Sequence, residues 1–187
     1  LYEQGEYFIE PQGIQVIDIQ DPYNPVILDE WDGVVQSHNV MEADGYLYVI
    51  GSTDEFSQDG ESESWGLDDL IILDLEDPSN PTKVGGWSGE YLHDVCIDGD
   101  LLYGCAIYAD EMYVFDISDK SNPSLISTWP GIPKAHACWV SEDSRTVFTG
   151  SETTGGHIMS WDVSDLSNVE CLDAWLPRES NESSRTL

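Results

Sequence analysis

An internal repeat constrains the fold of this 187-residue chain more than any other feature of its sequence. Four segments align without gaps over their central part, at residues 14–31, 70–87, 112–129 and 158–175. In each segment an apolar run ends in Asp, and a Trp follows at a constant spacing; the pairs are Asp18 and Trp31, Asp74 and Trp87, Asp116 and Trp129, and Asp162 and Trp175. Self-similarity of this kind indicates one structural unit stacked several times.

Each unit contains four short runs rich in Val, Ile, Tyr and Trp, which are residues that favour strands. After three of the four repeated tryptophans comes a His that opens a short apolar strand, and turns such as Asp44-Gly45 and Asp98-Gly99 then predict hairpins. Four strands in a unit of roughly 40–50 residues are typical of a β-propeller blade. No segment has helical periodicity, so we expect no helix longer than about two turns.

The sequence therefore predicts an all-β protein, with a β-propeller spanning residues 1–176 and a polar tail at 177–187. We expect about three complete four-stranded blades, near 38–88, 93–129 and 136–175, and a partial N-terminal blade within 1–31. The first unit lacks an innermost strand, and the polar tail offers none to complete it. Because closure is what hides the edges of a propeller, we expect an open fragment of a larger one.

The repeat also resembles a known family. The blade core I-x-V-I-D-I-x-D-P-x-N-P, followed by W-x-G, H-x-V and D-G-x-L-Y, is similar to the LVIVD-repeat proteins, including the choice-of-anchor B group of secreted and surface proteins. The resemblance covers nearly all of residues 1–176, with departures at Lys120, Leu166 and Val169. It implies a propeller in an extracellular, cell-surface or periplasmic location. It implies no particular chemistry, because the family has no single assigned activity.

The charge of the chain excludes several classes of partner. Acidic residues number 37 against 6 basic ones, for a formal charge of −31, and the first basic residue is Lys83. Phosphate backbones and anionic lipid headgroups need Lys and Arg, so nucleic acid and membrane surfaces are not expected partners. No apolar run is long enough to insert into a bilayer. Dense carboxylates instead suit high salt, divalent cations or cationic ligands.

Three histidines are the sharpest candidate site. His38, His93 and His136 open successive inner strands, which places them around one end of the central channel. Imidazoles there could bind a transition metal or act as a general base, with Asp94 orienting one ring. The alternative is a structural role, which the regular repetition favours. On that reading the rings are too far apart to share an ion across a wide channel, and their nitrogens bond to backbone within their own blades.

A second candidate is the acidic insertion in the first complete blade. It supplies carboxylates for a loose calcium cage, although the spacing fails the EF-hand pattern, and a solvated acidic loop is the default interpretation. Its aromatic residues Phe56 and Trp65 also suggest a platform for a sugar. The carboxylates in question are Asp54, Asp59, Glu61, Glu63, Asp68 and Asp69.

Other recurring residues have structural interpretations. The Asp-Pro-x-Asn-Pro motif is typical of a type I turn, and the repeated Trp is expected to seal adjacent blades from an outer strand. The four cysteines have no metal-binding spacing, and a hairpin at Asp98-Gly99 would not place Cys96 opposite Cys105. Buried free thiols are therefore favoured over a disulfide or a metal site.

No enzyme motif stands out: there is no nucleophile elbow, P-loop, dinucleotide fingerprint or HExxH. The sequence is best interpreted as a non-enzymatic secreted or cell-surface binding module whose ligand is a protein, a glycan or a cation. The alternative is a metalloenzyme with a histidine-lined central channel. No cofactor is certain, and the candidates are calcium or a transition metal.

Overall fold

The computed structural model describes residues 13–35, 37–52 and 68–176. Within these ranges the regular elements are β-strands, which form one two-stranded and three four-stranded sheets. The first sheet holds β1 (Ile14–Asp18) and β2 (Val26–Trp31). The second holds β3 (Asn39–Ala43), β4 (Tyr46–Ile50), β5 (Leu70–Asp74) and β6 (Thr82–Trp87). The third holds β7 (Asp94–Asp98), β8 (Leu101–Ala106), β9 (Glu111–Asp116) and β10 (Ser124–Pro130). The fourth holds β11 (Ala135–Val140), β12 (Thr146–Ser151), β13 (Ile158–Asp162) and β14 (Glu170–Trp175).

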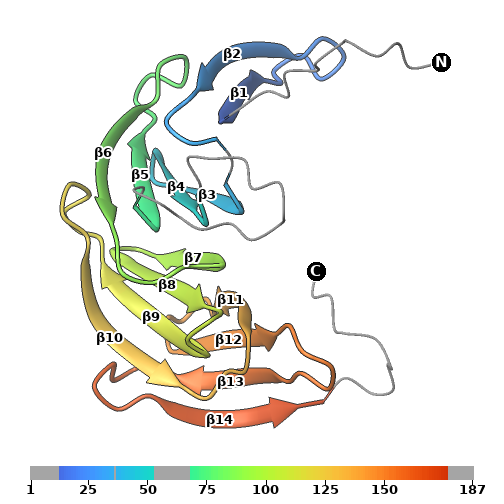
Figure 1. Ribbon diagram of the computed structural model, residues 1–187, viewed down its shortest axis with the longest axis vertical. Coiled ribbons are helices and arrows are strands. Elements are labelled where there is room, and N and C mark those ends of the chain that lie inside the picture. Colours follow the sequence, from blue (N-terminus) through green and yellow to red (C-terminus); the bar gives the residue numbers. More distant parts are fainter. Residues whose placement is uncertain (1–12, 36, 53–67, 177–187) are drawn as a thin grey trace.

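Every sheet is an antiparallel meander in chain order, and the sheets follow one another around an open arc (Figure 1). The first strands β3, β7 and β11 lie on the concave side of the arc, and the last strands β2, β6, β10 and β14 lie on its convex rim (Figure 1). The predicted fold is confirmed: in the described residues the protein is an all-β, propeller-type arc of three four-stranded blades and one two-stranded first blade. In the described part of the chain, no helical segment has the length and apolar character needed to cross a bilayer.

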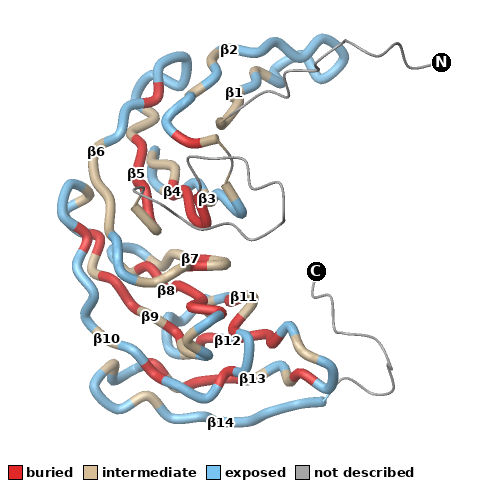
Figure 2. The backbone as a smooth tube through the Cα atoms, viewed as in Figure 1, coloured by how far each residue is buried: buried red, intermediate tan, exposed pale blue. Residues whose placement is uncertain are grey.

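Apolar side chains hold neighbouring sheets together. Phe115 of the third sheet belongs to a buried cluster shared with the second sheet, and the Trp87 ring meets Phe115 edge-on at a centroid distance of 4.8 Å. Trp129 of the third sheet packs against Trp161 of the fourth at 6.0 Å. These contacts confirm for Trp87 and Trp129 that the repeated Trp seals adjacent blades. Figure 2 shows the resulting buried band through the middle of the arc.

The turns follow the chemistry of the sequence. Asp21 opens the first Asp-Pro-x-Asn-Pro segment: its carbonyl accepts a hydrogen bond from the N–H of Asn24 at 3.0 Å, and its carboxylate accepts one from the N–H of Tyr23 at 3.1 Å. The same carbonyl bond recurs at the corresponding turns of the other three sheets. In the hairpin between β3 and β4, Asp44 and Gly45 both have positive φ, at 52° and 79°, as a type I′ turn requires. The turn interpretation is thus confirmed.

One irregularity recurs in all four sheets. The pairing between the last two strands of each sheet shifts register at the same place, so that one residue of the outermost strand has no partner opposite it. A bulge of this kind bends its strand and increases the local twist. The unopposed residues are Leu28 in β2, Val84 in β6, Ile126 in β10 and Leu172 in β14.

The cysteines are free thiols. Cys96 pairs with Tyr103 across the hairpin, as expected, while Cys105 pairs with Asp94. Cys96, Cys105 and Cys138 are buried between the third and fourth sheets, whereas Cys171 is exposed on β14. A hydrogen bond that the Cys96 thiol donates to Cys138, together with burial, raises the pKa of Cys96, and burial raises the pKa of Cys138. The buried thiols therefore remain protonated at neutral pH and behave as small apolar groups.

Candidate functional site

The site is built on the starts of consecutive inner strands. His38 directly precedes β3, His93 directly precedes β7, and His136 is the second residue of β11. Backbone hydrogen bonds to the following strand of the same sheet anchor the first two: the N–H of His38 donates to Ile50 O at 3.0 Å, and the N–H of His93 donates to Cys105 O at 2.8 Å. The hairpins of the second and third sheets therefore hold the backbones of His38 and His93, while His136 lies within β11 of the fourth sheet.

The three imidazole rings lie in contact. The ring centroids of His38 and His93 are 3.9 Å apart, and those of His93 and His136 are 4.5 Å apart. The expected wide separation does not hold for rings of neighbouring blades. That expectation considered positions on opposite sides of a wide channel, whereas inner strands of neighbouring blades run side by side, and their first side chains bridge the gap between sheets.

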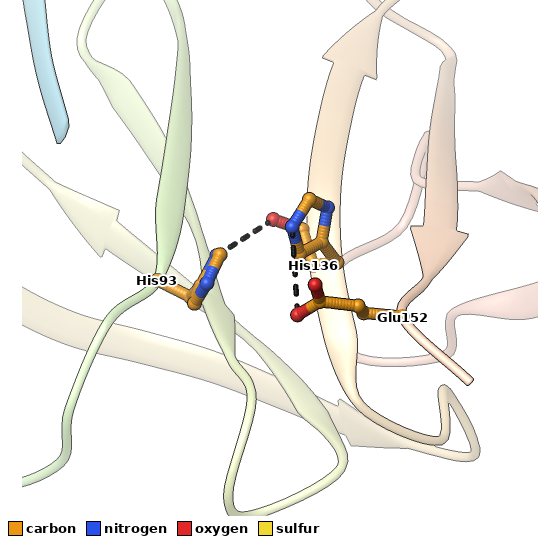
Figure 3. A group of neighbouring side chains, drawn as sticks. All are labelled: His93, His136 and Glu152. Atoms are coloured by element: carbon orange, nitrogen blue, oxygen red, sulfur yellow. Dashed lines mark hydrogen bonds and ion pairs between the residues drawn. The ribbon is translucent and has the colours of Figure 1, made fainter. Parts of the chain in front are cut away.

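His93 is oriented by the neighbouring blade. Its Nδ1 lies 3.3 Å from the carbonyl oxygen of His136, and an N–H on Nδ1 donates to that oxygen (Figure 3). The expected bond to backbone within its own blade is therefore replaced by a bond to the next sheet. Burial, together with the nearby His38 and His136 rings, lowers the pKa of His93. Its imidazole is thus held neutral, which is the form that ligates metals.

Glu152 completes the group from the fourth sheet. It directly follows β12, the strand that pairs with β11, and its Oε2 lies 3.6 Å from Nε2 of His136 (Figure 3). One ligand atom from each of His93, His136 and Glu152 lies within 4.8 Å of the others. Two imidazoles and a carboxylate form a donor set that zinc and other divalent transition metals use in proteins.

Asp94 does not orient a histidine ring as expected. Its Oδ1 accepts a hydrogen bond from Nδ2 of Asn39 in β3 at 2.7 Å, and the backbone N–H of Cys138 in β11 also donates to its carboxylate. Burial raises the pKa of Asp94 against these hydrogen bonds. Asp94 therefore links three consecutive inner strands just behind the histidines, and its role is to tie the blades together.

Aromatic side chains border the histidines on the side of the third sheet. The Tyr91 ring lies 6.3 Å from that of His93 and 5.3 Å from that of Tyr108. The ammonium of Lys134 sits 5.2 Å above the Tyr108 ring. Among the described residues, the basic group near Glu152 is the His136 imidazole, which carries charge only when protonated, and no lysine or arginine forms an ion pair with this carboxylate.

The acidic insertion is only partly described. Asp54, Asp59, Glu61 and Glu63 lie outside the described residues, and the proposed calcium cage stays a prediction for them. Asp68 accepts hydrogen bonds from Lys83 and Ser88, each at 2.7 Å. Asp69 accepts one from the N–H of Gly89 at 2.7 Å. These last two carboxylates therefore bind groups of their own blade.

Comparison with known proteins agrees with the repeat. A family model for the LVIVD repeat matches residues 66–87 and 89–129. A search of curated proteins finds no significant match.

Several solved structures share the fold. A functionally unknown protein from Desulfotomaculum acetoxidans superposes with a TM-score of 0.53 at 12% identity, over 86% of this chain and 62% of that one. A "putative 6-phosphogluconolactonase" from Bacteroides uniformis gives 0.54 at 11% identity, over 81% and 60%. Its counterpart from Bacteroides fragilis gives 0.53 at 12%, over 84% and 61%. At such identities the likeness shows the fold alone, and this chain spans about three fifths of the length of each structure.

Proposed function

We propose that this LVIVD-repeat protein is a non-enzymatic binding module, working outside the cytoplasm, that takes a divalent cation at the inner-strand end of its blades. The observation that carries the proposal is the convergence of the His38, His93 and His136 rings from three consecutive blades. Glu152 adds a carboxylate with no lysine or arginine paired to it among the described residues. A neutral imidazole and an unneutralised carboxylate both offer lone pairs to a cation.

The overall charge supports a cationic ligand. With 37 acidic and 6 basic residues, the protein creates a field that concentrates cations near its surface and repels anions. The same field disfavours a phosphorylated sugar such as the names of two structural neighbours imply. The similarity to these two structures therefore supports the fold in this proposal but does not suggest a substrate.

The location outside the cytoplasm rests on the resemblance to the secreted and surface choice-of-anchor B proteins. The acidic composition is compatible with it, because dense carboxylates keep a protein soluble where ionic strength is high and screening is strong. A protein partner or a glycan presented through the bound cation would fit the same module.

The test is equilibrium dialysis of the chain against Ca²⁺, Mg²⁺, Mn²⁺ and Zn²⁺ in about 1 M NaCl, where the Debye length falls to about 3 Å and diffuse attraction to the acidic surface is screened. We expect at least one cation to bind saturably at a whole-number stoichiometry and to raise the melting temperature. Absence of saturable binding by all four cations would overturn the proposal.

A metalloenzyme is the second candidate, and one observation favours it. The donor group supplies three protein ligands, and the Glu152 side chain is 45% exposed, so a bound ion would keep an open position toward solvent. Catalytic zinc sites have this arrangement. Hydrolysis of ester and lactone substrates by metal-loaded protein, abolished by chelation and by His136→Ala, would support this candidate over a purely binding role.

A further inference from the structure

We infer that the cation is a first-row transition metal ion of the Zn²⁺ type, ligated by Nε2 of His93, Nε2 of His136 and Oε2 of Glu152. This inference rests on the proposed function and makes it specific, since it assigns both the ion and its ligands. The three residues come from two neighbouring blades, so the site exists only where the third and fourth sheets meet (Figure 3).

His93 is set up as a ligand by its hydrogen bond. Because the N–H on Nδ1 donates to the carbonyl of His136 at 3.3 Å, the lone pair of the neutral ring lies on Nε2. Metal-binding histidines characteristically donate their other ring N–H to a carbonyl or carboxylate, which fixes both the tautomer and the ring plane. The His38 ring, tilted by 49° against His93 at a centroid distance of 3.9 Å, limits rotation of the His93 ring further.

Neither ring nitrogen of His136 makes a good hydrogen bond within the protein. Its Nδ1 is buried without a hydrogen bond, and its Nε2 faces Glu152 at 3.6 Å, which is longer than a good N–H···O bond. Two ligand atoms about 2.0–2.1 Å from a tetrahedral ion lie about 3.3 Å apart. The separation of Nε2 from Oε2 thus matches two ligands of one ion better than it matches a direct hydrogen bond.

The donor atoms must move closer together to ligate one ion, and the Glu152 side chain has the freedom to do so. One donor atom from each of the three residues lies within 4.8 Å of the others, so side chains at the outer limit of this spacing must approach by roughly 1.5 Å to reach the spacing of a tetrahedral shell. Glu152 has three side-chain torsions and lies just past the end of β12, and its side chain is 45% exposed. Its carboxylate can swing toward the two rings while both histidine backbones stay in their hydrogen-bonded hairpins.

The donor set selects the type of ion. Calcium and magnesium prefer oxygen ligands, six or more of them, whereas imidazole nitrogen suits Zn²⁺, Fe²⁺, Ni²⁺ and Cu²⁺. Two neutral imidazoles and one carboxylate leave a single positive charge on a bound divalent ion, and the acidic surroundings favour that charge. The site is therefore separate in its donor chemistry from the acidic insertion that the sequence places between β4 and β5.

The experiment titrates the chain with Zn²⁺ by calorimetry and with Co²⁺ by visible absorption, in about 1 M NaCl with millimolar Ca²⁺ and Mg²⁺ as competitors. We expect one equivalent of Zn²⁺ and a Co²⁺ spectrum of a low-coordinate site. His93→Ala and His136→Ala should each weaken Zn²⁺ binding by more than about 100-fold, and Glu152→Gln should weaken it by about 10- to 100-fold. The matched controls are His157→Ala, at a histidine outside the repeated position, and Glu76→Gln, at an exposed glutamate; both should retain wild-type affinity.

Circular dichroism and thermal unfolding of each metal-free variant verify that the fold is intact. The inference is overturned if Zn²⁺ does not bind, or if it binds equally well to His93→Ala, His136→Ala and their controls. If Ca²⁺ or Mn²⁺ binds saturably while the histidine variants behave as wild type, the ligand assignment fails and the binding module stands. If no divalent cation binds, the proposed function fails as well.

Discussion

Trp129 and Trp175 occupy the same position in two consecutive repeats, yet they meet different surroundings. Trp129 is 4% exposed because the fourth sheet covers it, and its ring contacts Trp161 at 6.0 Å. Trp175, on the outermost strand of that fourth sheet, is 44% exposed, and the neighbouring Leu172 and Leu176 are also exposed. Figure 2 shows β14 as an exposed strand on the rim of the arc. The repeated sequence thus specifies the outermost strand of each sheet. Whether the apolar residues of that strand are buried depends on whether a further sheet packs against them.

The sealed interface itself has two parts. Its outer part is an apolar cluster around Trp129, Val147 and Trp161. Its inner end is polar and holds His93, His136 and the carboxylate of Asp94. We interpret the apolar part as the source of stability and the polar end as the source of function, and substitutions at each part separate the two.

The largest effect is expected for Trp129→Ala. Removing a buried Trp leaves a cavity between the third and fourth sheets and should lower the free energy of unfolding by about 3–5 kcal/mol. Trp175→Ala should change it by less than about 1 kcal/mol, because that ring is already largely in solvent. Urea denaturation of both variants measures the difference. Equal losses at the two positions would contradict the contrast between sealed and open faces.

Thiol reactivity sharpens the same contrast. Cys171 lies on the exposed β14, whereas Cys96, Cys105 and Cys138 lie in the sealed interface with raised pKa values. At pH 8 a disulfide reagent should modify Cys171 at least about 100-fold faster than the other three, which react only after opening of the interface. The measurement is thiol counting over time, with Cys171→Ser as the control. If more than one thiol per chain reacted rapidly in the folded protein, the interface between the third and fourth sheets would open more readily than we expect.

Asp94→Leu tests the link between inner strands. The substitution leaves the amide of Asn39 and the backbone N–H of Cys138 without their acceptor, and we expect a loss of about 1–3 kcal/mol in the free energy of unfolding. Asn39→Ala removes only the donor at the other end of one bond and should cost less. Thermal unfolding of both variants gives the comparison. If Asp94→Leu left the free energy of unfolding unchanged, the apolar cluster alone would hold the inner strands together.

The smallest effect is expected for His136→Leu in metal-free protein. The buried Nδ1 of His136 lacks a hydrogen bond, so an apolar side chain of similar size should leave stability unchanged or raise it by up to about 1 kcal/mol. A residue whose role is structural would behave in the opposite way. Chemical denaturation in the presence of a chelator measures this, and a loss above about 2 kcal/mol would contradict the assignment of His136 to function.

Most of the fold could be predicted from the sequence because each blade repeats the same information. The Asp-to-Trp spacing located the outer half of every blade, and Asp-Gly turns located the hairpins. The histidines were found because they share one phase of the repeat. The repeat does not predict the distance between the histidine rings, because that distance depends on how closely the inner strands of neighbouring blades approach each other.

Glu152 was missed for a related reason. The strand registers place it at the same position as Ser52 and Ile107 in the preceding blades, so an acid occurs there in one blade of the three. A useful signal was nevertheless present, because Glu152 follows the strand that pairs with the one carrying His136. An acidic residue that breaks the repeat beside a repeated histidine predicts a donor group.

The bulge shared by all four outermost strands has a consequence for assembly. A second chain can extend a sheet only by matching a continuous row of free N–H and C=O groups along its edge. In β2, β6, β10 and β14 the row is interrupted at Leu28, Val84, Ile126 and Leu172, so an incoming strand loses register partway along. We therefore expect the convex rim to resist strand addition and fibre growth, even though β2, β10 and β14 expose apolar side chains on it.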